Sequence, residues 1–110
     1  MARESTAAVR CDRTAAWAAL QNHFEKAGHA LDLRQAFGAD PGRLATFSQE
    51  APHLFADISK NLIDAPTEAL LLDLARQCGV EAQRDAMLRG DAINNTEQRA
   101  VKHWLLRTPA

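Results

Sequence analysis

The chain has 110 residues, 46% of them apolar, and its 13 Lys and Arg residues nearly balance 14 Asp and Glu residues. A domain of this size buries roughly two-thirds of its unfolded surface, but few aromatic residues are present, so Ala and Leu must form most of a modest core. The charge pattern lacks the basic stripe of a nucleic-acid-binding protein. No apolar run reaches the ~20 residues of a membrane span, and the polar start lacks a secretory signal. We expect a cytoplasmic protein without nucleic-acid or membrane partners.

The first helix is predicted over residues 13–27, because apolar residues recur there at steps of three and four. These residues are Trp17, Leu20, Phe24 and Ala27. Asp12 or Thr14 is suited to cap its start. Gly28 is expected to end it in a left-handed conformation.

A short helical turn is predicted at 32–37. A further helix over 41–47 is expected to begin at Asp40-Pro41, which suits a first helical turn, and to direct Leu44 and Phe47 inward. The segment 49–52 resembles a loop. The residues from Leu54 to Ile58 form the only plausible strand, and it requires a partner from this chain or another.

Two helices follow. The first starts at Asp64-Ala65-Pro66-Thr67 and ends at Gly79, with a clear apolar stripe. That stripe comprises Leu70, Leu71, Leu74, Ala75 and Cys78. The second covers 80–89 and stops at Gly90. After a loop at 91–95, Asn95 or Thr96 is expected to cap a last helix that Pro109 stops, with its apolar stripe at Ala100, Val101, Trp104 and Leu105.

These patterns predict a mainly α fold with at most a short strand element. Residues 1–11 show no period and are expected to form a loose N-terminal arm. Residues 12–110 are expected to form one helical segment.

Few residues suggest chemistry. Four scattered histidines, His23, His29, His53 and His103, show no metal-ligand spacing, so we expect surface or partly buried side chains and no metal or other cofactor. Cys11 and Cys78 stand far apart in the sequence and are expected to be a reduced pair rather than a disulfide.

Two further groups admit two interpretations each. Ser59-Lys60 is able to bind phosphate or activate a nucleophile, but a turn after the strand is favoured. Glu97 and Arg99 with His103 suggest a carboxylate–cation site, but helix capping and a polar helix face are favoured. No catalytic, substrate-binding or metal residue is therefore predicted.

Four motifs in order resemble the glucose-6-phosphate isomerase family. They are Asp32-Leu33-Arg34 with Phe37, Asp40-Pro41 with Arg43, Phe47 and Ser48, Asp57-Ile58-Ser59-Lys60-Asn61, and the run from Gly90 to Arg107 that contains Ile93-Asn94 and Thr96-Glu97. The resemblance covers residues 12–107. The family usually has Tyr at Ile58, Gly at Gln98, Leu at Lys102 and Ala at Leu105.

The resemblance implies the N-terminal segment of a cytoplasmic enzyme of glycolysis and gluconeogenesis. Such enzymes interconvert glucose 6-phosphate and fructose 6-phosphate without a metal: a His opens the ring, and a Glu moves a proton through an enediol. The full chain implied has two α/β/α sandwich domains and forms a homodimer. Its catalytic and substrate-binding groups lie downstream of the matched region, so residues 1–110 are expected to be an inactive scaffold whose partner is the remainder of the chain.

A second hypothesis is a stand-alone helical interaction module that self-associates. The modest core and the unpaired strand favour it, because uncovered apolar surface drives association.

Overall fold

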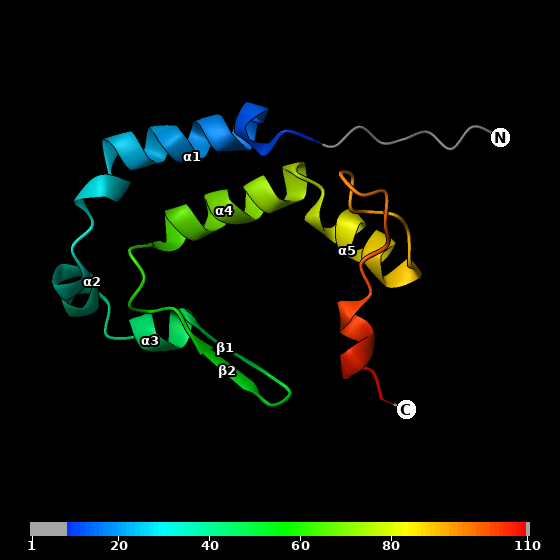
Figure 1. Ribbon diagram of the computed structural model, residues 1–110. Coiled ribbons are helices and arrows are strands. Elements are labelled where there is room, and N and C mark those ends of the chain that lie inside the picture. Colours follow the sequence, from blue (N-terminus) through cyan, green and yellow to red (C-terminus); the bar gives the residue numbers. More distant parts are fainter. Residues whose placement is uncertain (1–8, 110) are drawn as a thin grey trace.

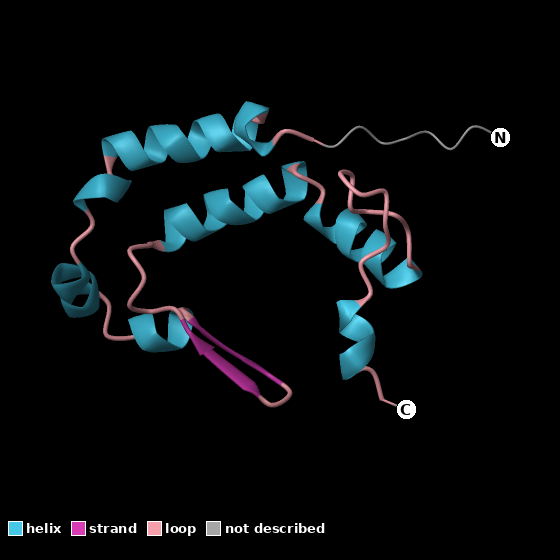
Figure 2. Ribbon diagram, viewed as in Figure 1, coloured by secondary structure: helices cyan, strands magenta, loops and turns pink. Residues whose placement is uncertain are grey.

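The computed structural model describes residues 9–109, which are mainly helical, as the sequence predicts (Figures 1 and 2). Part of the predicted N-terminal arm, residues 1–8, lies outside the described residues. The elements in chain order are η1 (Cys11–Arg13), α1 (Ala15–Lys26), η2 (Gly28–Ala30), α2 (Leu33–Ala39), α3 (Arg43–Thr46), β1 (Ser48–Ala51), β2 (Leu54–Asp57), α4 (Ala65–Gln77), α5 (Val80–Arg89) and η3 (His103–Arg107).

Helices α1 and α4 form an antiparallel pair (Figure 1). Thr14 caps α1 by accepting from the Trp17 amide at 3.1 Å, which confirms one of the two predicted caps. At the start of α1, the Ala16 amide donates to Gln77 Oε1 at the end of α4, at 2.9 Å. Ala16 is buried in this contact. A small buried residue and a side-chain hydrogen bond therefore join α1 to α4 at this end of the pair.

The expected end of α1 is wrong in one respect. Gly28 does not adopt a left-handed conformation, since Gly79 and Gly90 are the only described glycines with positive φ. Instead Gly28 is the first residue of the 3-10 turn η2, and the Gly28 carbonyl accepts from the Leu31 amide at 3.3 Å. A 3-10 turn is another way to satisfy the last carbonyl groups of a helix.

The region after η2 is more irregular than predicted. The helical turn predicted at 32–37 forms as part of α2, and the Asp32 side chain caps it. The next helix, α3, begins at Arg43 rather than at Pro41, because Asp40 Oδ1 accepts from the Gly42 amide at 2.9 Å and holds a turn there. Phe47 is buried as predicted, but Leu44 is 52% exposed, so its predicted inward orientation is wrong.

The predicted strand pairs with the segment just before it. We predicted a loop at 49–52, and this prediction is wrong because most of that segment belongs to strand β1. Strands β1 and β2 pair antiparallel, with Ser48 opposite Asp57 and Ala51 opposite Leu54. The turn between them holds Pro52 and His53, and His53 has φ 62°. Pro at the first central position and a positive φ at the second suit a tight reverse turn. Pro52 therefore marks the hairpin turn and not a loop.

Helices α4 and α5 agree closely with the prediction. The Asp64 side chain caps α4. Gly79 (φ 72°) and Gly90 (φ 82°) bound α5 in the left-handed conformation that Gly adopts without steric cost.

The predicted last α-helix is absent from the described residues. Asn94 Oδ1 accepts from the amides of Thr96 and Glu97, both at 3.2 Å, and the Asn94 and Arg99 backbones form a β-bridge. Gln98 has φ 54°, which no α-helix accommodates. Only the 3-10 helix η3 follows. Since most helix stability comes from packing rather than from local sequence, the period of the apolar stripe by itself does not enforce an α-helix.

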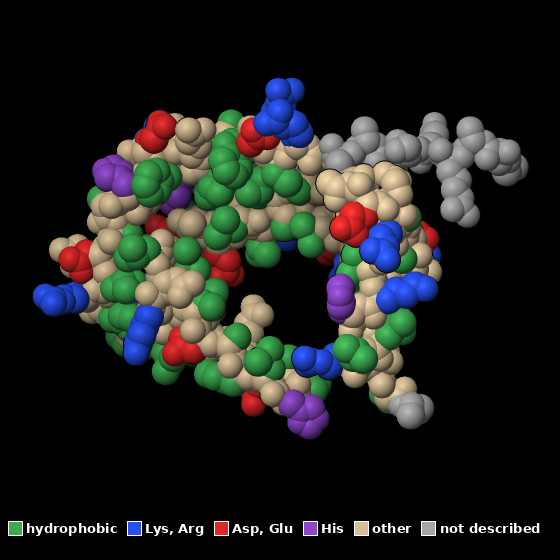
Figure 3. Space-filling model, viewed as in Figure 1, with side chains coloured by type: hydrophobic (Ala, Val, Ile, Leu, Met, Phe, Trp, Pro, Cys, Tyr) green, Lys and Arg blue, Asp and Glu red, His purple; other side chains and the backbone are tan. Residues whose placement is uncertain are grey.

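The described residues form an open arc around a central opening (Figure 3). The radius of gyration is 18.1 Å, whereas a compact domain of this length has about 13 Å. Ala16 and Phe47 are the buried apolar residues of the described chain, while most large apolar side chains are exposed; Leu106 reaches 86%. None of the helices within 9–109 has the length and apolarity needed to cross a membrane.

Candidate functional site

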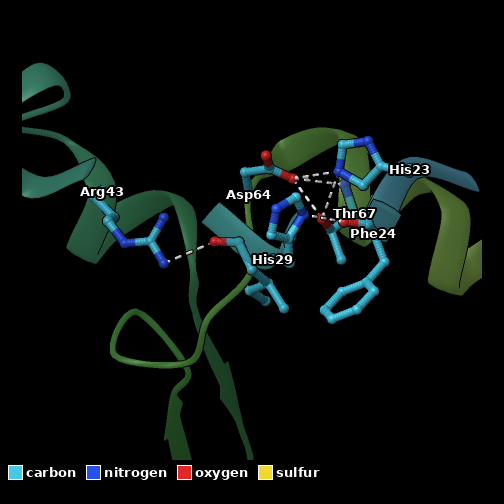
Figure 4. A network of polar contacts seen from close by, with 7 residues as sticks. His23, Phe24, His29, Arg43, Asp64 and Thr67 are labelled. Carbon is cyan, nitrogen blue, oxygen red and sulfur yellow. Dashed lines mark hydrogen bonds and ion pairs between the residues drawn. The ribbon is translucent and has the colours of Figure 1, made fainter. Parts of the chain in front are cut away.

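Arg43 is the most buried charged side chain of the described chain, with 3% exposure. Its Nε donates to the carbonyl of Ser59 at 2.8 Å, and its Nη2 donates to those of Asn61 and Ile63 at 3.0 and 2.8 Å. Figure 4 shows the Arg43 side chain with one of these bonds. Arginine suits this position because its planar fork presents several donors in fixed directions. One side chain from α3 thereby fixes three carbonyl groups of the segment between β2 and α4.

Aromatic rings complete the surroundings of the guanidinium. Its central carbon lies 4.6 Å from the centroid of the Phe47 ring and 5.4 Å from that of Phe37. Such cation–π contacts favour the charged group where water is excluded. The cation is therefore held by backbone oxygens and ring faces, and its role is to position the loop.

The loop that Arg43 holds contains Ser59-Lys60. Asp57 Oδ1 accepts from the Ser59 amide at 2.8 Å, and hydrogen bonding from Ser59 lowers the pKa of Asp57 below its usual range. Ser59 is 1% exposed, whereas Lys60 is exposed. The structure places this dipeptide in a turn, the interpretation that the sequence favours, and it separates the buried serine from the solvent-exposed ammonium.

A second polar cluster joins α1 to the start of α4 (Figure 4). The Thr67 hydroxyl donates to Asp64 Oδ1 at 2.5 Å, and the Thr67 amide donates to the same oxygen at 2.8 Å. His23 Nε2 lies 3.0 Å from the Thr67 hydroxyl oxygen and 3.4 Å from Asp64 Oδ1. Because the hydroxyl hydrogen is directed to Asp64, the Thr67 oxygen accepts from His23 Nε2–H.

These bonds have an electrostatic consequence for Asp64. The Thr67 hydroxyl bond, followed by smaller contributions from the Thr67 amide and from His23, outweighs burial and lowers the pKa of Asp64. The carboxylate therefore remains charged at neutral pH and caps α4.

An apolar groove lies beside this cluster, between α1, η2 and the segment before α4. It has a volume of about 460 Å³. Its main apolar lining consists of Trp17, Leu20, Phe24, Leu31 and Leu62, and His23, His29 and Thr67 add polar groups. His29 Nδ1 lies 2.8 Å from the carbonyl of Phe24, and the two rings meet edge to face. The predicted apolar face of α1 thus lines an open groove rather than a closed core.

The remaining candidates lie in the C-terminal part. Arg99 Nη1 and Glu97 Oε2 form an exposed pair at 3.4 Å. Glu97 stands in the turn that Asn94 organises, so its predicted place at a helix start is wrong. Arg99 belongs to the β-bridge, so the expected helical i, i+4 face with His103 does not form. Lys102, where the family usually has Leu, is exposed to solvent.

Sequence reasoning missed both polar clusters. Arg43 was part of a recognised motif, but nothing in the pattern of charges marked it as buried. His23 and Thr67 lie 44 positions apart, so no local spacing joins them. Residues 9–109 contain no group of three or more His, Cys, Asp or Glu side chains able to hold a metal ion.

Comparison with known proteins gives consistent matches. A family model described as phosphoglucose isomerase matches residues 57–110. A glucose-6-phosphate isomerase of Albidiferax ferrireducens is 66% identical and one of Polaromonas naphthalenivorans 63% identical, each over 92% of this chain and 19% of the relative. One of Leptothrix cholodnii is 62% identical over 91% of this chain and 18% of the relative. The chain therefore spans about a fifth of the length of these curated relatives.

Proposed function

Because the chain belongs to the glucose-6-phosphate isomerase family, matching its N-terminal part, we propose that it serves an enzyme that interconverts glucose 6-phosphate and fructose 6-phosphate. The observation that carries this proposal is the identity of 62–66% across nine-tenths of the chain. The reaction is an aldose–ketose isomerisation through an enediol, in glycolysis and gluconeogenesis. We place the enzyme in the cytoplasm and expect it to act as a homodimer.

Within that enzyme, residues 1–110 act as a scaffold and are inactive by themselves. The clusters around Arg43 and around Asp64 hold loops and helix ends, and neither presents a nucleophile or a general base to an enclosed pocket. The sugar phosphate is bound by the remainder of the enzyme.

The partner of this chain is the remainder of the isomerase, and the groove beside α1 is one of its docking surfaces. Trp17, Phe24 and Leu62 are exposed by 41%, 59% and 66% in the groove. Covering such side chains contributes roughly 25 cal/mol per Å² of apolar area. An arc with this much uncovered apolar surface is stabilised when another part of the enzyme packs against it.

A chimera tests the proposal. The matching segment of the Albidiferax ferrireducens relative is replaced by residues 1–110, and conversion of fructose 6-phosphate is measured. We expect the chimera to be active and the separate 110-residue chain to be inactive. A folded but inactive chimera would contradict the family role, and turnover by the separate chain would contradict the scaffold role.

Matched variants test the groove. Leu62→Glu in the chimera places a carboxylate at the docking surface, where burying an unpaired charge is costly, so assembly and activity should fall together. Glu25→Lys, at an exposed position of α1 that does not line the groove, should change neither. Equal activities of the two variants would show that the groove is not a docking surface.

The exposed apolar side chains also favour the second candidate function, a self-associating module. Sedimentation of the separate chain distinguishes the two. Defined oligomers that Leu62→Glu dissolves would support self-association, whereas a dispersed monomer at high concentration would exclude it.

A further inference from the structure

Two cysteines that are far apart in the sequence come together at one end of the α1–α4 pair. Cys11 opens η1 just before α1, and Cys78 is the C-terminal cap residue of α4. The Thr14 hydroxyl donates to the Cys11 carbonyl at 2.8 Å and fixes the turn that carries Cys11. The neighbouring Ala16–Gln77 bond joins positions 61 apart in sequence. Both cysteines therefore sit at the same end of the α1–α4 pair.

The Ala16–Gln77 bond holds the turn that carries Cys11 beside the end of α4 that carries Cys78. In this arrangement Cys11 acts on the ionisation of Cys78: hydrogen bonding with the Cys11 side chain, together with burial, raises the pKa of Cys78 to about 11. Both thiols are free; Cys11 is exposed and Cys78 is half-buried. Cys11 is thus the thiol that a reagent in solution reaches first, and Cys78 is placed to react with it afterwards.

We propose that Cys11 and Cys78 form a redox-responsive clip, which closes as a disulfide under oxidising conditions and locks α1 to α4. A small-molecule disulfide such as oxidised glutathione is the oxidant. The Cys11 thiolate attacks one of its sulfurs, forms a mixed disulfide and releases one glutathione thiolate. The Cys78 thiolate then attacks the Cys11 sulfur and releases the second. Each cysteine gives up one proton, and the two electrons lost by the pair reduce oxidised glutathione to two thiols.

The order of attack follows from the contact. While the Cys11 sulfur is free, the Cys78 thiol donates to it, and this interaction stabilises the neutral form of Cys78 and makes Cys78 a poor nucleophile. Once Cys11 is consumed, that bond is lost and Cys78 ionises more readily. The closed clip holds the N-terminal end of α1, the helix that forms one wall of the groove, against α4. It also ties together positions far apart in the chain, which restricts the unfolded state.

The test measures the thiol–disulfide equilibrium of the 110-residue chain in glutathione buffers, in native buffer and in guanidinium chloride. The intramolecular disulfide is identified by the loss of two hydrogen masses and by the linked Cys11–Cys78 peptide. The effective concentration of the pair should be at least about tenfold higher in native buffer, because the fold holds the thiols together. Equal values in the two solvents would overturn the proposal.

Thermal unfolding provides a second readout. The oxidised chain should melt about 10 °C or more above the reduced chain. The single variants Cys11→Ser and Cys78→Ser should each lose this redox-dependent shift and form only mixed disulfides with glutathione. A persistent shift in either variant, or an oxidised wild-type chain that melts no higher than the reduced one, would contradict the clip.

Discussion

His23 on α1 and Thr67 on α4 are joined side chain to side chain, with Nε2 and Oγ1 3.0 Å apart. The same Thr67 hydroxyl donates to Asp64, the residue that caps α4. One hydroxyl group therefore links the end of one helix to the start of the other. Together with the Ala16–Gln77 bond at the opposite end, it fixes the α1–α4 pair at two points.

Replacing Thr67 by valine should separate these roles. Thr67→Val keeps the shape and the amide bond to Asp64 but removes the hydroxyl, so we expect a loss of about 1–2 kcal/mol in the free energy of unfolding. Urea unfolding followed by circular dichroism measures it. Thr46→Val is the matched control, because the exposed Thr46 hydroxyl donates only to the carbonyl of Gly42, the N-cap residue of the same helix, α3. Equal losses in both variants would contradict a link between helices.

Acidification should weaken the same region. The folded-state pKa of Asp64 is lowered, so the unfolded chain binds a proton more readily. The stabilisation is fully present above the unfolded pKa and is lost as pH falls below about 4 and through the folded pKa. Asp64→Asn keeps an N-cap acceptor but does not titrate, so its unfolding free energy should fall less on acidification. Parallel pH curves for the two proteins would contradict this assignment.

Substitution of Arg43 should lower the free energy of unfolding more than substitution of an exposed arginine. Arg43→Met keeps much of the apolar stem but leaves the carbonyls of Ser59, Asn61 and Ile63 without their donor. We expect a loss of about 3 kcal/mol or more, measured by urea unfolding. Arg34→Met is the control, since Arg34 is exposed on α2, and its effect should stay within about 0.5 kcal/mol. Similar effects at both positions would show that Arg43 does not hold the loop.

Replacing Gln98 by glycine, the residue that the family usually has at this position, should stabilise the fold. The Gln98 φ of 54° is costly for a side chain with a Cβ and not for glycine. Gln98→Gly should therefore raise the unfolding free energy by about 0.5–1 kcal/mol, seen as a higher melting temperature. Gln83→Gly, the same change inside α5, should lower stability by about 1 kcal/mol. Destabilisation by both would indicate that the turn at Gln98 does not form.

The sequence by itself determined the helices whose ends are marked by local chemistry. Thr14 and Asp64 cap helices, and Gly79 and Gly90 end them, and each signal acts within about four residues of its own position. The family motifs were readable for the same reason, because they are runs of neighbouring residues. That information was enough for the mainly helical fold and for the family.

Tertiary structure decided what depends on residues far apart. The burial of Arg43 follows from three carbonyl groups up to 20 positions away, and the pairing of Cys11 with Cys78 follows from the crossing of α1 and α4. The apolar residues at 100–105 matched a helix by period, but the Asn94 turn and the positive φ of Gln98 interrupt a helix there, and only the 3-10 helix η3 forms. Local hydrogen bonds set helix ends, whereas burial is set by which segments meet, and period alone does not determine that.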